Sequence, residues 1–149
     1  MALNEIYNYL QLTDHLATAG QPSEAQLAEV AQAGCQLVIN LARTGQDYSL
    51  PDEASTVLAN GMEYIHIPVI WEAPTRTNLE NFMAVMQANH GRRVFLHCAA
   101  NMRVSAFVAL DRILRLGWTR EQAFADMQRI WNPDARWKDF IEGALSLQS

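Results

Sequence analysis

Apolar and polar positions form blocks with two different periods along the middle of the chain. Short runs that are almost wholly apolar, at Leu37–Leu41 and Arg93–His97, are typical of strands buried on both faces of a parallel sheet. Between such runs lie longer stretches whose apolar residues recur three and four positions apart. In Thr77–Asn89, for example, Phe82 and Met86 share one face of a helix. This alternation predicts strands and helices that follow one another in turn.

Local start and stop signals set the bounds of the other elements. Ser23-Glu24-Ala25-Gln26 is a capping-box pattern that opens a helix, and Gly34 and Gly61 close two helices. The predicted strands are Ile6–Leu12 and Leu16–Thr18 (a hairpin around Thr13-Asp14-His15), Leu37–Leu41, Tyr64–Val69 and Arg93–His97. The predicted helices are Ser23–Ala33, Pro51–Asn60, Thr77–Asn89, Val104–Leu116, Thr119–Trp131 and Pro133–Leu147.

The order of these elements predicts an α/β fold. We expect one three-layer domain over residues 1–149, with a short, mostly parallel central sheet flanked by helices. Ligands of such sheets bind at the carboxyl ends of the strands. The loops after Leu41, Val69 and His97 should therefore meet at one edge.

Composition narrows the class of protein. Half of the 149 residues are hydrophobic, 18% are charged, and the net charge is −5, which argues against general nucleic-acid binding. No apolar run has the length of a membrane span, and the first residues lack a secretion signal. Two cysteines in different contexts do not resemble a disulfide framework, so we expect a reducing, cytoplasmic compartment.

The segment from His97 to Arg103 carries the clearest chemical signal. Cys98 and Arg103 bracket a short loop between a buried strand and a helix. Backbone N–H groups of such a loop and the positive end of the helix face any bound anion, and the same field favours the thiolate of Cys98. Cys98 is therefore a candidate nucleophile.

Other residues with chemical potential have simpler interpretations. Cys35 precedes a buried strand and is expected in the core. The remaining histidines show no metal-ligand spacing, so no metal or cofactor is expected. We expect the tryptophans to be packing anchors, with Trp71 also near the Cys98 loop; they are Trp71, Trp118, Trp131 and Trp137.

Four segments resemble the cysteine-dependent protein tyrosine and dual-specificity phosphatases, and in particular their small bacterial phosphatase-like branch. They are Thr18–Ser23, Gly34–Leu41, Ile67–Val69 and Val94–Arg103 (VFLHCAANMR), and the likeness runs from Leu16 to Leu116. The His-Cys pair after an apolar strand is the specific part.

The resemblance implies an enzyme that hydrolyses phosphomonoesters through a phosphocysteine at Cys98. Arg103 would grip the phosphate oxygens, and His97 would orient the loop. Backbone N–H groups would come from Ala99, Ala100, Asn101 and Met102. The partner would be a phosphorylated small molecule or protein.

The loop departs from the family pattern. It has four residues between Cys98 and Arg103, one fewer than usual, with Asn101 where a left-handed Gly is expected. Alternatively, Ser105 lies at the family's usual distance from the cysteine, which puts Val104 at the arginine position. The four-residue spacing resembles rhodanese-type sulfurtransferases, so a Cys98 persulfide is an alternative, as is a non-catalytic phosphate-binding module.

The phosphatase mechanism also needs an acid. The resemblance places it in the loop Ile70–Arg76, where Glu72 is the carboxylate. Trp71 and Pro74 would shield Glu72 from water and keep it protonated. Asp47 and Asp52 are weaker candidates, and Asp111 is expected to be a structural partner of a nearby arginine.

Overall fold

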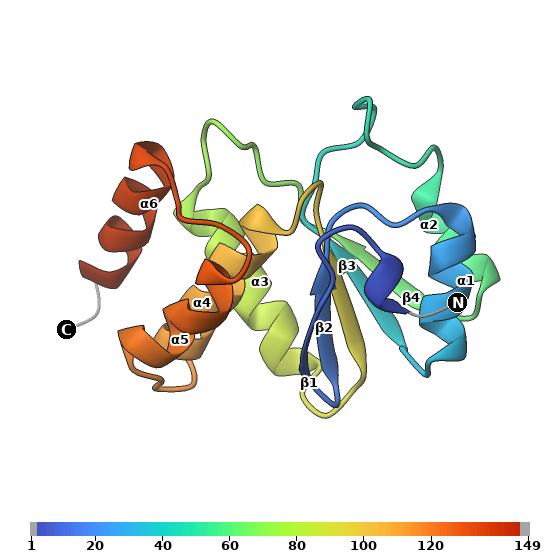
Figure 1. Cartoon of the computed structure of the whole chain (residues 1–149), viewed down its shortest axis with the longest axis horizontal. Coiled ribbons are helices and arrows are strands. Elements are labelled where there is room, and N and C mark those ends of the chain that lie inside the picture. The colour runs from blue at the N-terminus through green and yellow to red at the C-terminus, as the bar shows by residue number, and fades with distance from the viewer. Residues whose placement is uncertain (1–2, 147–149) are drawn as a thin grey trace.

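The computed structural model describes residues 3–146 of the chain. Residues 1–2 and 147–149 lie outside this range, and with them Leu147, the predicted end of the last helix. Three layers are visible in Figure 1, with a sheet between two groups of helices. The expected three-layer α/β arrangement is confirmed.

The central sheet has five strands in the order β1-β2-β5-β3-β4. Among the strands of residues 3–146, β1 and β2 pair antiparallel, while β2, β5, β3 and β4 run parallel. The strands are β1 (Leu10–Thr13), β2 (Leu16–Ala19), β3 (Leu37–Asn40), β4 (Glu63–His66) and β5 (Val94–His97).

The central strands are buried on both faces. Because successive side chains of a strand point to opposite faces of the sheet, they are divided between two cores. Leu37 and Ile39 of β3 face one core, whereas Val38 faces the other. In β5, Phe95 joins the core that contains Val38. The nearly unbroken apolar runs of the sequence reflect this double burial.

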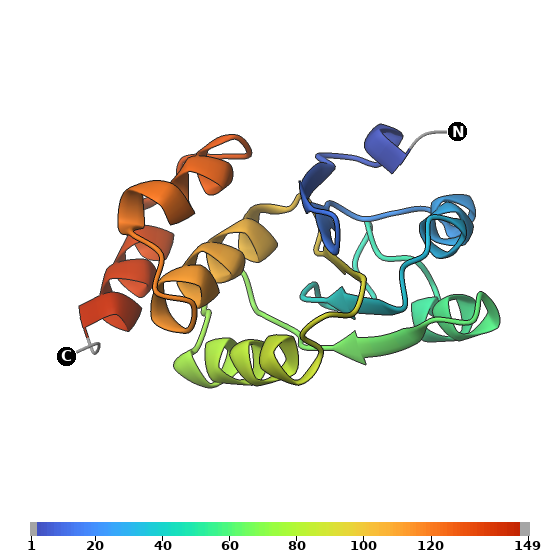
Figure 2. The same cartoon turned by 90° about the horizontal axis from the view of Figure 1, so that it is seen from below.

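Helices cover both faces of the sheet, as Figures 1 and 2 show. One group packs over the core around Val38, and the other packs over the larger core. The first group is α1 (Glu24–Gln32) and α2 (Glu53–Ala59); the second is α3 (Arg76–Ala88), α4 (Met102–Leu114), α5 (Arg120–Gln128) and α6 (Ala135–Ser146). The capping box at Ser23 is confirmed, and Thr119, the predicted start of its helix, forms a second one with Gln122.

Several predicted bounds differ from the structure, among them the end of β4 at His66 (predicted Val69), the start of α4 at Met102 (predicted Val104) and the end of α5 at Gln128 (predicted Trp131). Two further differences have a clear local cause. The first strand begins at Leu10 and not at Ile6, because Asn8 has a left-handed backbone (φ 51°) and a short 3₁₀ helix, η1 (Leu3–Glu5), precedes it. Helix α3 begins after Thr75 and not at Thr77. The side chains of Thr75 and Asn78 each accept from the other's backbone N–H, which completes a capping box one half-turn earlier.

Within residues 3–146, every helix is too short or too polar to cross a membrane.

Candidate active site

A cavity of about 290 Å³ opens at the carboxyl edge of the parallel strands. Its walls come from the loops after β3, β4 and β5, so the expected meeting of these three loops is confirmed. The lining residues are Arg43, Gln46, Tyr48, Trp71, Glu72, Cys98, Ala99, Ala100, Met102 and Arg103.

The loop between β5 and α4 has the backbone that its sequence predicts. Asn101 is left-handed (φ 66°, ψ 5°), the conformation that glycine usually supplies. Its amide Nδ2 donates to the carbonyl oxygen of Asn8 and to Oγ1 of Thr18, each at 2.9 Å. These bonds hold a buried, unusual turn in place from the N-terminal segment.

The carbonyl groups of this loop are bonded to the neighbouring segment at its back. The carbonyl oxygen of Ala99 accepts from the N–H of Gln21 (3.0 Å), and that of Ala100 accepts from Nδ2 of Asn8 (3.0 Å). Within residues 3–146, the N–H groups of Ala99, Ala100 and Met102 have no hydrogen-bond partner. Because these three residues line the cavity, their N–H groups are available to an anion there.

Arg103 brings a guanidinium group to the same cavity. The residue is 5% exposed, and its Nη1 donates to the carbonyl oxygen of Val69 at 2.7 Å. Its Nη2 lies 3.5 Å from the hydroxyl oxygen of Tyr48. Val104, in contrast, is fully buried in the core. The alternative alignment with Val104 at the arginine position therefore does not describe this cavity.

Ser105 lies away from the cavity. Its hydroxyl donates to the carbonyl oxygen of Met102 (2.9 Å) and accepts from Nε1 of Trp131 (3.0 Å). Ser105, which the resemblance suggested as a supporting residue of the loop, braces the start of α4 against Trp131 in the structure.

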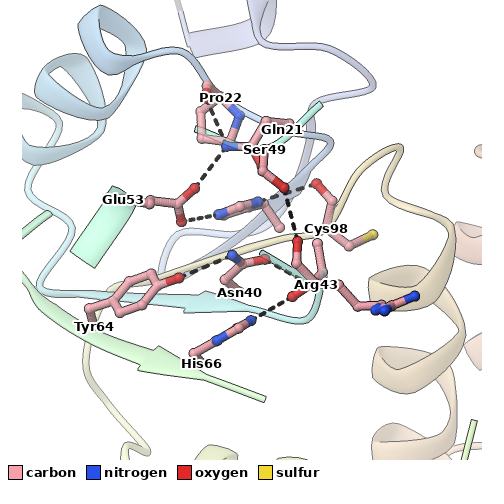
Figure 3. Close-up of polar contacts among 11 residues, drawn as sticks. Gln21, Pro22, Asn40, Arg43, Ser49, Glu53, Tyr64, His66 and Cys98 are labelled. Atoms are coloured by element: carbon pink, nitrogen blue, oxygen red, sulfur yellow. Dashed lines mark hydrogen bonds and ion pairs between the residues drawn. The ribbon is translucent and has the colours of Figure 1, made fainter. Parts of the chain in front are cut away.

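A second positive side chain, which sequence analysis did not single out, lines the cavity. Arg43 follows β3 and is exposed. In Figure 3 its side chain extends toward the same side of the strand ends as the sulfur of Cys98. The polar loop after a parallel strand was the available signal, because such loops border the ligand site.

Glu72 lies at the cavity, but its environment differs from the prediction. Its side chain is exposed, so the expected shielding is wrong. The indole of Trp71 instead packs against those of Trp131 and Trp137, with centroids 5.3 and 5.5 Å away. This packing turns Trp71 toward the core and leaves Glu72 open to solvent.

A buried contact between His97 and Glu53 behind the loop was not predicted. His97 is completely buried, and its Nε2 lies 2.6 Å from Oε2 of Glu53, the first residue of α2. Nδ1 of His97 lies 3.2 Å from the carbonyl oxygen of Cys98. The signal for such a partner was the burial of His97 itself, since buried polar groups are almost always hydrogen-bonded.

The remaining candidates do not line the cavity. Asp52 borders a separate cavity beside Tyr64 and His66, and Asp47 is exposed. Asp111 pairs with Arg115 through two bonds of 2.7 and 2.9 Å, as expected.

Cys35 is half-buried against the core of α1 and α2. Of the tryptophans, Trp118 is 37% exposed and is not a core anchor.

Sequence comparison links this chain to a described family. Residues 8–114 match the model of the phosphatase-like domain of beta-lactamase hydrolase-like proteins. The beta-lactamase hydrolase-like protein of Xylella fastidiosa (strain Temecula1) is 25% identical over 108 residues, and that of Agrobacterium fabrum is 29% identical over 108 residues. Each match covers 70% of this chain but only 25% of the relative.

Solved structures have the same fold. The DUF442 protein of Shewanella putrefaciens CN-32 is 30% identical, with a TM-score of 0.85, covering 97% of this chain and 95% of its own. Tk-PTP in its active form has a TM-score of 0.79 at 19% identity, covering 94% of this chain and 97% of its own. TpbA of P. aeruginosa, solved with pTyr, has a TM-score of 0.68 at 16% identity, covering 98% and 84%. The fold is that of cysteine-dependent tyrosine and dual-specificity phosphatases.

Proposed function

The chain belongs to the phosphatase-like domain family of beta-lactamase hydrolase-like proteins, and on that premise we propose that it hydrolyses phosphomonoesters through Cys98. One observation supports this most directly. The thiol of Cys98, the guanidinium of Arg103 and the unpartnered N–H groups of Ala99, Ala100 and Met102 share one cavity. A nucleophile and an oxyanion site thus lie together.

The proposed reaction has two steps. The Cys98 thiolate attacks phosphorus, the bond to the ester oxygen breaks, and Glu72 gives its proton to the departing alkoxide. Water then attacks the phosphocysteine while the Glu72 carboxylate takes its proton, and inorganic phosphate leaves with Cys98 restored as thiolate. Arg103 and the loop N–H groups would hold the phosphoryl oxygens throughout.

The substrate is a phosphorylated small molecule or protein. The two arginines at the cavity, Arg43 and Arg103, suit a substrate with more than one negative charge. Because Arg43 is exposed, we expect it to contribute to substrate binding and not to the chemical step.

Sulfur transfer is the second candidate, since the loop has four residues between Cys98 and Arg103. A Cys98 persulfide would need no proton donor such as Glu72. The same N–H groups could accommodate an oxyanion donor such as thiosulfate.

The two functions can be distinguished with the wild-type chain and Cys98→Ser. We expect slow hydrolysis of an aryl phosphate, a phosphocysteine trapped by rapid acid quench, and loss of both in Cys98→Ser. Cys35→Ala is the matched control and should retain activity, because Cys35 lies outside the cavity. Cyanide-dependent turnover of thiosulfate without hydrolysis of any phosphate ester would instead establish the sulfurtransferase. Phosphate binding without either turnover would leave a binding module.

A further inference from the structure

The pair formed by Glu53 and His97 is isolated from solvent directly behind the Cys98 loop. His97 is 0% and Glu53 6% exposed. The second carboxylate oxygen of Glu53, Oε1, accepts from Nε2 of Gln21 at 2.8 Å. In Figure 3 a dashed line joins Glu53 to Gln21, and Cys98 lies farther to the right.

Both ring nitrogens of His97 face hydrogen-bond acceptors. Nδ1 lies near the carbonyl oxygen of Cys98, which can only accept, and Nε2 lies near the carboxylate of Glu53. Burial acts to raise the pKa of Glu53. The hydrogen bond and charge of His97, together with Gln21 and the charge of His66, outweigh burial and hold that pKa below its ordinary value. An ionised Glu53 and a carbonyl acceptor both call for N–H donors, and a ring that carries a proton on each nitrogen supplies both.

We propose that Glu53 is a positioning residue that keeps His97 in its imidazolium form and so maintains a positive charge beside the Cys98 thiolate. The inference rests on the proposed role of Cys98 as nucleophile. A fully buried imidazolium without a counter-ion loses its proton, because burial disfavours the charged form. Glu53 therefore acts on Cys98 through His97 and touches neither substrate nor sulfur.

The direction in which the pH midpoint of Cys98 reactivity moves on loss of Glu53 distinguishes this role from a direct charge effect of Glu53 on the thiol. A carboxylate near a thiol disfavours the thiolate, so its removal alone would make Cys98 more reactive at low pH. We expect the opposite, because loss of Glu53 also discharges His97. Nδ1 of His97 lies 3.2 Å from the carbonyl oxygen of Cys98, whereas Glu53 contacts the other ring nitrogen, Nε2. The other charged or titratable groups remain in both forms: Tyr64 and His66 on β4, and Arg43, Tyr48, Glu72 and Arg103 at the cavity.

The test is the pH dependence of iodoacetamide alkylation at Cys98 in a Cys35→Ala background. In Glu53→Gln we expect the midpoint to move up by about one pH unit, so that alkylation at low pH is about tenfold slower. Glu53→Asp keeps the charge and should restore part of the effect. Glu63→Gln removes an exposed carboxylate of β4, paired with Arg92, and should leave the midpoint unchanged. A midpoint that stays or moves down in Glu53→Gln would overturn the proposal.

A double variant tests whether Glu53 acts through His97. In a His97→Asn background, Glu53→Gln should cause no further rise of the midpoint. A further rise equal to that of the single variant would overturn the proposal.

A measurement on the wild-type chain tests the proposal even if the variants do not fold. Nitrogen-15 NMR of the imidazole at pH 7 should show two protonated ring nitrogens for His97. A neutral tautomer would overturn the proposal whatever the variants do. Neither measurement needs turnover, so a shifted midpoint in a chain without phosphatase activity would refute the proposed function and leave this inference standing.

Discussion

Arg103 donates through Nη1 to the carbonyl oxygen of Val69 at 2.7 Å, which ties the start of α4 to the segment after β4. Val69 is itself fixed, because its N–H donates to the carbonyl oxygen of Leu41 at 2.9 Å. The guanidinium is therefore anchored at one nitrogen, while the residue also lines the cavity. Such anchoring orients the remaining N–H groups in advance, which lowers the entropic cost of binding an oxyanion.

Arg103→Lys should weaken oxyanion binding while the fold persists. Lysine cannot both bond Val69 and present two parallel N–H groups, so we expect vanadate affinity to fall by about 10–100-fold. Inhibition by vanadate and the thermal midpoint would be measured together. Arg76→Lys, on the exposed surface of α3, is the control. Unchanged vanadate inhibition would show that Arg103 does not contact the anion.

Gly20→Ala should impair the Cys98 loop from behind. A Cβ atom at Gly20 would lie 2.6 Å from the carbonyl oxygen of Ala99 and 2.7 Å from the ring of Tyr7, so the loop must shift. We expect at least about a tenfold loss of kcat/KM, since small displacements of positioned groups are costly. Gly61→Ala is the matched control. Its φ of +80° makes the variant less stable by about 1–2 kcal/mol, but nothing lies within 4 Å and activity should persist. Equal activity in both variants would contradict the assigned position of the loop.

Local features of the cavity could be predicted from the sequence. The strand, the Cys98 loop and the following helix are neighbours in the chain, and Asn101 has the one side chain in that loop that tolerates a left-handed backbone well. The meeting of three loops followed from parallel strands, whose carboxyl ends share an edge. These inferences needed only short-range patterns and the general rule for α/β sheets.

Long-range polar pairing could not be predicted in the same way. Glu53 and His97 are 44 positions apart, and an acidic residue in the first turn of a helix is usually interpreted as a solvated favourable charge. The environment of Glu72 was mispredicted for the same reason, because it depends on contacts between residues far apart in sequence. A tryptophan beside a carboxylate suggests shielding, but the packing of Trp71 with Trp131 and Trp137 depends on α6 and its preceding loop, far away in sequence.

The phenol of Tyr64 should lose its proton at a higher pH than an ordinary tyrosine. Burial, together with the charge and hydrogen bonding of Glu53, raises the pKa of Tyr64 to about 12, although a hydrogen bond from Asn40 opposes this. A raised pKa in the folded state stabilises the fold below pH 10, and this contribution is lost as the pH rises through 12. Absorbance titration should show one late phenolate that disappears in Tyr64→Phe. The free energy of unfolding should fall less steeply above pH 10 in that variant. An identical titration curve for both proteins would refute the assignment.

Glu72→Gln tests the acid, and the leaving group decides the size of the effect. An alkyl alkoxide is a poor leaving group, so loss of a proton donor should slow its release by about 10²–10⁴-fold. An aryl phosphate with an acidic phenol needs little protonation and should be affected much less. Glu80→Gln removes an exposed carboxylate of α3 and is the control. Rates on both esters, measured at one pH with rapid quench, give the ratio. Equal losses on the two esters would mean that Glu72 acts on binding and not on proton transfer, and no loss on either would leave the acid to be supplied by solvent.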